Sequence, residues 1–201
     1  MNNFYLVGNN LALDLANTLA AGDDGGEIEL LKNLDDLLDW AVAADILTKK
    51  QAADARRWDV SEGKDIVDLT TGFRRELKLM AKALSRGKPV PRSAINRIND
   101  VLRRKEGHFE VRQTARGYES EFKVKFDNIT DLLLPIAESA MNLLCSGDLA
   151  LVKKCENAAC VLYFYDTSKR HGRRWCSMTS CGNRAKAQAF YKRKSDMKKL
   201  Q

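Results

Sequence analysis

The stretch "CENAACVLYFYDTSKRHGRRWCSMTSC", residues 155–181, contains four of the five cysteines of this 201-residue chain. They follow the spacing C-x4-C-x15-C-x4-C, as two close pairs at Cys155, Cys160, Cys176 and Cys181. Two such pairs joined by a loop can place four thiolates at the corners of a tetrahedron around zinc. A module this small cannot fold on its apolar content alone, so metal binding would supply much of its folding free energy. The spacing therefore predicts one structural Zn²⁺ ion.

Two disulfides are the alternative use of the same cysteines, and they require an oxidising compartment. The start of the chain, "MNNFYLVGNN", lacks the basic region and cleavage site of a secretory signal, and no apolar run is long enough to span a membrane. We therefore expect a cytoplasmic protein with reduced cysteines.

His171 lies between the two cysteine pairs and could replace one cysteine as a zinc ligand, but a solvated loop histidine is the simpler interpretation. Cys145 is expected to be a small buried apolar side chain in a core helix.

Positive charge is concentrated at the carboxyl end. The net charge is +7, but residues 153–201 hold 13 Lys and Arg against 3 Asp and Glu, and the remainder holds 21 against 24. Such asymmetry favours a polyanion as partner, although a solvated basic surface is the alternative.

The sequence after Cys181, "GNRAKAQAFYKRK" (residues 182–194), predicts a helix whose first turn is positioned by metal ligation. On a helical wheel one arc contains Arg184, Gln188, Tyr191 and Lys192. Arg and Gln suit contacts with base edges and Lys suits phosphates, so this pattern favours DNA. The preceding loop adds four cations: Lys169, Arg170, Arg173 and Arg174. RNA, an acidic protein partner, and simple neutralisation of a four-thiolate zinc site remain alternatives.

The rest of the chain has mainly helical periodicity. We predict helices over residues 11–20, over 34–47 with Asn33 as cap, and from Thr48, as cap, through Trp58. Further helices are predicted over 65–86, with an apolar stripe that includes Phe73 and Leu77 and an end at Gly87, from Pro91 to 105, and over 129–146 ending at Gly147. Alternating apolar residues in 108–126, including Phe109 and Val111, predict a β-hairpin with one buried face and Gly117 in its connection.

These elements define the expected architecture. It is a mainly α (α+β) fold: a helical domain with a β-hairpin over residues 1–148, a treble-clef-like zinc module over 149–194, and a basic tail over 195–201. Nothing in the sequence indicates catalysis, since it has no phosphate-binding Gly-rich loop, zinc-protease motif or nucleophile with a histidine partner. We therefore expect a protein that is not an enzyme.

Residues 155–193 resemble the CGNR zinc-finger family, through Cys181-Gly182-Asn183-Arg184 and the preceding "YDTS" and "RRWCSM". The segment "LALDLANTL", residues 11–19, resembles the opening motif of the ABATE domain that accompanies this finger. The resemblance implies a bacterial stress-induced transcription regulator, with zinc at the four cysteines and DNA contact around Asn183 and Arg184. The family usually has Cys where Ala12 stands, so no thiol function is assigned there.

Polar residues on the first predicted helix are candidates for a ligand pocket. Asp14, Asn17 and Thr18 interrupt an apolar helix, and Arg74 or Arg75 could supply a counter-charge. The alternative is that they satisfy buried backbone groups or one another. We expect a zinc-dependent DNA-binding regulator whose larger domain senses an effector or forms a homodimer. The alternative is a small-molecule-binding protein whose zinc module binds RNA or another protein.

Overall fold

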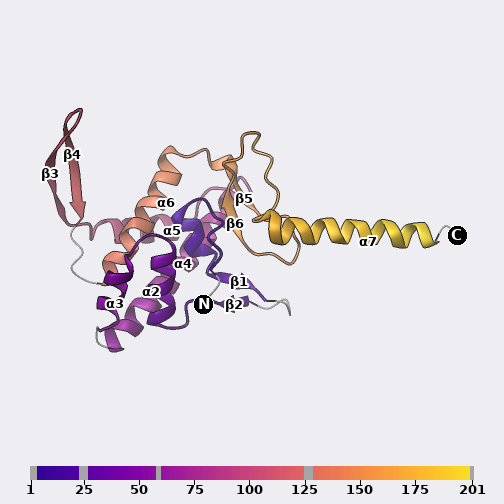
Figure 1. Ribbon diagram of the computed structural model, residues 1–201, viewed down its shortest axis with the longest axis horizontal. Helices are drawn as coiled ribbons and strands as arrows, with labels where there is room; N and C mark the ends of the chain where they lie inside the picture. The colour runs from indigo at the N-terminus through magenta and orange to yellow at the C-terminus, as the bar shows by residue number, and fades with distance from the viewer. Residues whose placement is uncertain (1–3, 23–26, 58–59, 125–128, 200–201) are drawn as a thin grey trace.

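A computed structural model describes residues 4–22, 27–57, 60–124 and 129–199 of the chain. The described residues form a helical body and three two-stranded antiparallel sheets (Figure 1). The elements of the body are α1 (Leu11–Ala16), β1 (Leu19–Ala21), β2 (Glu27–Glu29), α2 (Leu34–Ala43), α3 (Lys49–Ala55), α4 (Val60–Leu84), α5 (Arg92–Leu102), β3 (Gly107–Thr114), β4 (Gly117–Val124), η1 (Ile129–Leu133) and α6 (Leu134–Ser146). They are followed by η2 (Leu149–Leu151), β5 (Val152–Lys154), β6 (Tyr163–Tyr165), the π-helical turn η3 (Met178–Gly182) and α7 (Asn183–Lys199). The predicted α-rich fold class is confirmed.

The core forms where α1 packs against both α4 and α6. Leu13 and Leu15 on α1 and Phe73 and Leu77 on α4 are fully buried. Their spacing on α4 is the predicted stripe, because residues three and four apart lie on one side of a helix. The helix ends as predicted at Gly87, whose positive φ of 62° is readily adopted by glycine.

Two predicted helix caps are present. The Asn33 side chain accepts the N–H of Asp36 at 2.9 Å, and Thr48 and Gln51 form a reciprocal capping box. The helix after Thr48 ends at Ala55, and Trp58, to which it was expected to extend, lies outside the described residues.

The first predicted helix is too long. It ends at Ala16, and Leu19–Ala21 form β1, which pairs with β2 in the register Leu19↔Glu29. The cause is side-chain competition at Asn17 and Thr18. Thr18 Oγ1 donates to the carbonyl of Leu15 at 2.8 Å, and Asn17 bonds to the backbone of Tyr163. Such bonds offer the backbone an alternative to the helix.

The β3–β4 hairpin forms as predicted, with Gly117 opening the second strand, but β3 does not have the predicted buried face; the apolar side chains expected at 122–126 lie outside the described residues. Phe109 and Val111 are 74% and 75% exposed. The hairpin projects from the body at the end of the molecule opposite α7 (Figure 1). Alternation identifies side chains that share a face, but it does not identify what covers that face. Cys145, expected to be buried, is also exposed on α6.

Candidate metal centre and nucleic-acid interface

The four cysteines of the paired motif come together in one buried cluster. All of their sulfur atoms lie within 4.8 Å of one another. Cys176 Sγ lies 3.7 Å from Cys160 Sγ and 3.6 Å from Cys181 Sγ. Tetrahedral ligands at a Zn–S distance of about 2.3 Å are separated by about 3.8 Å, so the arrangement could hold one zinc ion. The cysteines are free, so the disulfide alternative is not adopted.

The two cysteine pairs come from different local structures. Cys155 directly follows β5 and its N–H donates to the carbonyl of Leu162 at 3.0 Å, which extends the β5–β6 pairing. Cys160 closes a turn by donating its N–H to the carbonyl of Asn157 at 2.9 Å. Cys181 lies in η3, which continues into α7. The cluster therefore joins a strand turn to the start of the terminal helix.

The cysteine thiols perturb one another strongly. Hydrogen bonds from the thiols of Cys160 and Cys176 lower the pKa of Cys155 to about 2. The hydrogen bond to Cys155 raises the pKa of Cys160 to about 12, and bonds to Cys155 and Cys160 raise the pKa of Cys176. Ionisation of Cys155 therefore disfavours ionisation of Cys160 and Cys176. A divalent cation reverses this preference because it stabilises every thiolate that binds it.

His171 is not a member of this cluster. The metal group contains cysteines alone, and the His171 side chain is exposed, with Nδ1 3.2 Å from the carbonyl oxygen of Asp166. This agrees with the interpretation of His171 as a loop histidine.

The amino-terminal segment packs directly on the zinc module. Val7 and Ala20 pack in the apolar cluster that contains the four cysteines. The Tyr165 N–H donates to the carbonyl of Gly8 at 2.8 Å, and the Asn17 side chain both accepts from the N–H and donates to the carbonyl of Tyr163, each at 2.9 Å. The zinc module is thus built onto the helical body through hydrogen bonds as well as apolar packing.

The four residues proposed for a ligand pocket have three separate sets of partners. Thr18 Oγ1 accepts a hydrogen bond from Arg74 Nη1 at 3.1 Å, and Arg74 forms a two-point ion pair with Glu29. Asn17 is bonded to Tyr163, as described above. Asp14 instead accepts the N–H of Gly8 at 2.7 Å, where a Cβ on the glycine would lie 2.9 Å from Asp14 Oδ1. Their hydrogen bonds are with other groups of the protein, and a ligand role for them stays a prediction.

Asp14 provides a test of pH dependence. Burial raises its pKa to about 6, although the Gly8 N–H and the charge of Arg173 oppose the shift. In the unfolded chain Asp14 has a pKa of about 3.8, so between about pH 4 and pH 6 it is ionised in the unfolded state and still protonated in the folded state. The free energy of unfolding therefore falls as the pH rises through this range, and above it the loss is constant. Asp14→Asn keeps an acceptor for Gly8 and removes this cost. We expect a gain of about 1–2 kcal/mol at pH 7 and little gain at pH 4, measured by urea unfolding. The same gain at both pH values would contradict this explanation.

The four loop cations have different environments. Lys169 and Arg170 are exposed. Arg174 is exposed as well, but its Nε contacts Glu156 Oε2 at 2.6 Å and its guanidinium lies over the Trp175 ring.

Arg173 is partly buried and donates to the carbonyls of Val7, Trp175 and Cys176. Its guanidinium lies 4.2 Å from the centre of the Phe164 ring. Arg173 therefore joins the amino-terminal segment to the cysteine region.

Asp166 is an important residue that the sequence reasoning did not select. Its side chain is completely buried and accepts hydrogen bonds from Lys153 Nζ at 2.6 Å, Ser168 Oγ at 2.6 Å and the Arg173 N–H at 2.9 Å. Burial alone would raise the pKa of Asp166, but these hydrogen bonds outweigh it and hold the pKa well below its usual range. Asp166 fixes both ends of the loop that carries Lys169 and Arg170. The available signal was the Asp-x-Ser pattern in "YDTS", which favours a side-chain-stabilised turn.

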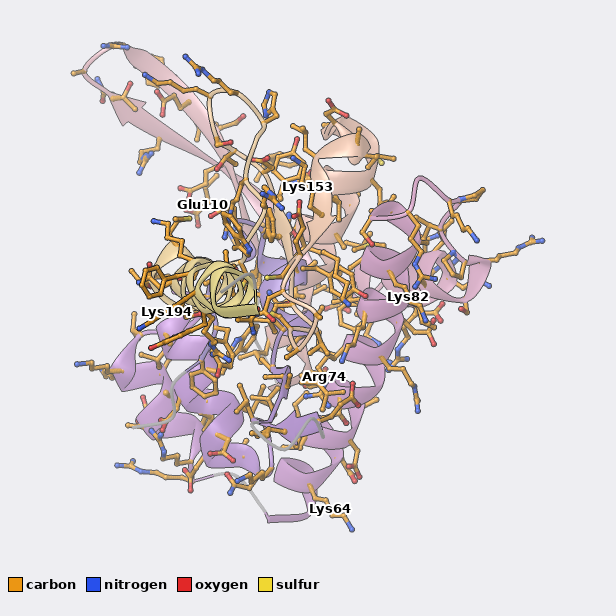
Figure 2. The ribbon with its side chains drawn as sticks, turned by 90° about the vertical axis from the view of Figure 1, so that its right-hand side faces the viewer. Lys64, Arg74, Lys82, Glu110, Lys153 and Lys194 are labelled. Carbon is orange, nitrogen blue, oxygen red and sulfur yellow. The ribbon has the colours of Figure 1, made fainter. Side chains whose placement is uncertain are left out.

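The helix α7 extends away from the body, and Figure 2 views it almost end-on. The side chains of Asn183, Arg184, Gln188 and Tyr191 are exposed, and Asn183 Nδ2 donates to the carbonyl of Thr179 at 3.1 Å. Lys192 lies on the same helix, outside the residues whose side chains are described. The helix continues through Lys199 into the segment expected to be a tail. The four predicted contact residues of α7 whose side chains are described are thus accessible.

Comparison with protein families gives two adjacent matches. Residues 9–147 match the ABATE family, described as "Putative stress-induced transcription regulator", and residues 152–194 match the CGNR zinc finger. No curated protein matches the chain. Within the described residues, no helix is long and apolar enough to cross a membrane.

Proposed function

This chain belongs to the ABATE family and carries a CGNR zinc finger, and from that premise we propose that it regulates transcription by binding DNA through the finger. The observation that carries the proposal is the position of α7. The helix leaves the cysteine cluster directly after Cys181 and exposes cationic and amide side chains on a segment clear of the core. We assign residues 1–148 to the body and residues 149–194 to the finger.

In the proposed complex, zinc has a structural role. Ligation of Cys181 holds the turn η3 and hence the direction of α7. Arg184 and Gln188, one helical turn apart, contact base edges, because their side chains can form paired hydrogen bonds with purines. Lys169 and Arg170, on the loop held by Asp166, contact phosphates. These phosphate contacts supply affinity, and the base contacts supply sequence preference.

The proposal predicts DNA binding that depends on salt and on the exposed side of α7. We expect selection of genomic fragments by the zinc-loaded protein to fail with the double variant Arg184→Ala, Lys192→Ala, and affinity for a selected fragment to fall by about 10–100-fold. Wild-type affinity should also fall at least about tenfold between 50 and 200 mM salt, because phosphate contacts release counterions. Fluorescence anisotropy measures both effects.

The matched control is Lys49→Ala, Lys50→Ala, which removes two exposed cations from α3, at a distance from α7 (Figure 1). This control should bind as the wild type does. Undiminished binding by the α7 variant would refute the proposed contact side. Affinity that hardly changes with salt would refute DNA binding itself.

Binding of single-stranded RNA is a second candidate because of an exposed aromatic pair. Phe190 and Tyr191 on α7 are 56% and 67% exposed and pack edge to face with ring centres 5.7 Å apart. Exposed aromatic rings beside cations can stack on unpaired bases. Competition between duplex DNA and single-stranded RNA of the same sequence separates the two candidates, since preference for the RNA would favour the second.

A further inference from the structure

A groove of about 940 Å³ lies where the helical body meets the zinc module. It is bordered by α4, the β1–β2 pair and the β5–β6 region, which supplies Lys154, Val161 and Tyr163. Arg74 and Lys82, both on its border, lie along α4 in Figure 2. Its volume falls within the range of small-molecule sites, about 300–1,000 Å³. The groove is separate from the cysteine cluster and uses different side chains from those assigned to DNA.

The groove has an excess of positive charge. Seven of its lining residues are Lys or Arg and three are Asp or Glu. Two of the carboxylates are already paired, Glu29 with Arg74 and Glu27 with Lys78. Within the part of the chain that the structure describes, no ion pair involves the cations Arg75, Lys82, Arg86 or Lys154. These four cations are available to an anion.

The free cations are arranged along one side of the groove. Arg75 and Lys82 fall within an arc of about 20° when successive residues of α4 are placed about 100° apart, and Arg86 follows two residues after the end of α4 at Leu84. Lys154 comes from β5 of the zinc module. Cations from both parts of the molecule therefore border the same space.

The groove also has apolar lining, which restricts the kind of anion. Leu19 and Val161 line it and are half-buried, and Leu79 lines it and is 40% exposed. Tyr163 also lines the groove; burial raises the pKa of its hydroxyl, and the positive charge of Arg86 opposes that shift. A free phosphate or a DNA backbone would contact the cations but would leave the apolar lining in water. An organic body covering that lining would gain about 25 cal/mol per Å² of apolar surface removed from water.

We propose that this groove binds a small organic anion with an apolar body, whose anionic group contacts Lys82, Arg86 and Lys154. Lys82 and Arg86 extend from the body and Lys154 from the zinc module, so the bound anion links the two. The site does not depend on DNA binding by α7, and it can be tested without DNA.

A suitable probe is 8-anilinonaphthalene-1-sulfonate, which combines aromatic rings with a sulfonate. Its binding to the full-length, zinc-loaded protein is measured by calorimetry and by fluorescence. We expect one site, and an affinity at least about tenfold lower in the triple variant Lys82→Gln, Arg86→Gln, Lys154→Gln, because charge-assisted contacts are lost. The matched control Lys49→Gln, Lys50→Gln, Arg104→Gln removes three exposed charges elsewhere and should bind within about twofold of the wild type.

Two further probes separate the contributions of charge and apolar surface. N-Phenyl-1-naphthylamine has similar rings without the sulfonate, and inorganic pyrophosphate has charge without rings. We expect both to bind at least about tenfold more weakly than the sulfonate. Circular dichroism and zinc content verify that the variants are folded. If the triple variant is unfolded, the single variant Lys154→Gln replaces it, and we expect its affinity for the sulfonate to be about threefold lower than that of the wild type.

Equal binding by the groove variant and the wild type would overturn the proposal. So would pyrophosphate binding as tightly as the sulfonate, which would indicate a site for phosphate alone. If the groove variant no longer bound duplex DNA but bound the sulfonate as the wild type does, these cations would contact DNA and not a small anion, and the proposal would be wrong. Loss of DNA binding by the α7 variant, with sulfonate binding retained, would leave the groove proposal intact.

Discussion

Cys176→Ser is expected to abolish stoichiometric zinc binding and to disorder the zinc module. Cys176 lies within 3.7 Å of two other ligand sulfurs, and its backbone N–H donates to Cys155 Sγ at 3.4 Å. Zinc contributes on the order of 10 kcal/mol to folding in isolated zinc-finger peptides, and a serine hydroxyl is a poor substitute for a thiolate. Native mass spectrometry should show loss of the metal, and hydrogen exchange should show loss of protection over residues 152–182.

The helical body should remain folded in this variant, because its core of α1, α4 and α6 is separate from the cysteine cluster. Exchange in α4 should therefore change little. Cys145→Ser provides the matched control, since Cys145 is exposed on α6 and outside the cluster. It should retain one zinc ion. A Cys176→Ser protein that kept both its zinc and its exchange protection would contradict the four-thiolate site.

Asp166→Ala is expected to destabilise the protein by about 3 kcal/mol, the lower end of the range for breaking a buried ion pair, because Asp166 is fully buried but Lys153 is 31% exposed. The substitution leaves the Arg173 N–H without its acceptor and removes the charged partner of the Lys153 ammonium, which keeps only the carbonyl of His171 at 2.6 Å. DNA affinity should fall with it, because the loop that carries Lys169 and Arg170 loses its anchor. Urea unfolding at pH 7 measures the first effect and fluorescence anisotropy the second.

Glu156→Ala is the matched control for Asp166. Glu156 forms an ion pair of the same length with Arg174, but its side chain is 48% exposed, so its loss should cost less than about 1 kcal/mol. The two substitutions should also differ in how their effect on the free energy of unfolding depends on pH. The pKa of Asp166 is lowered by folding, so its stabilisation is complete above about pH 4 and declines as the pH falls further. If Asp166→Ala and Glu156→Ala lowered the free energy of unfolding equally, the burial of Asp166 would not explain its contribution to stability.

Local signals in the sequence predicted several elements correctly. The Asn33 and Thr48 caps, the α4 stripe and the Gly87 stop depend on residues within a few positions of one another. The length of the first helix was wrong because the Asn17 side chain binds Tyr163, 146 positions away. The hairpin was found, but its exposure was not, because alternation carries no information about what packs on a face. Cys145 was wrongly expected to be buried, because the sequence of α6 likewise does not show which of its sides is covered.

What the sequence determined by itself was the chemistry of the zinc site. The number, type and spacing of the cysteines were sufficient, because two close pairs need only a loop between them to meet around one ion. Tertiary structure alone decided how the polar residues are used. Arg173, whose contact with DNA stays a prediction, donates to the carbonyl of Val7, 166 positions earlier, and Asp166 anchors the loop. A side chain's role depends on the groups that surround it after folding, and those groups come from distant parts of the chain.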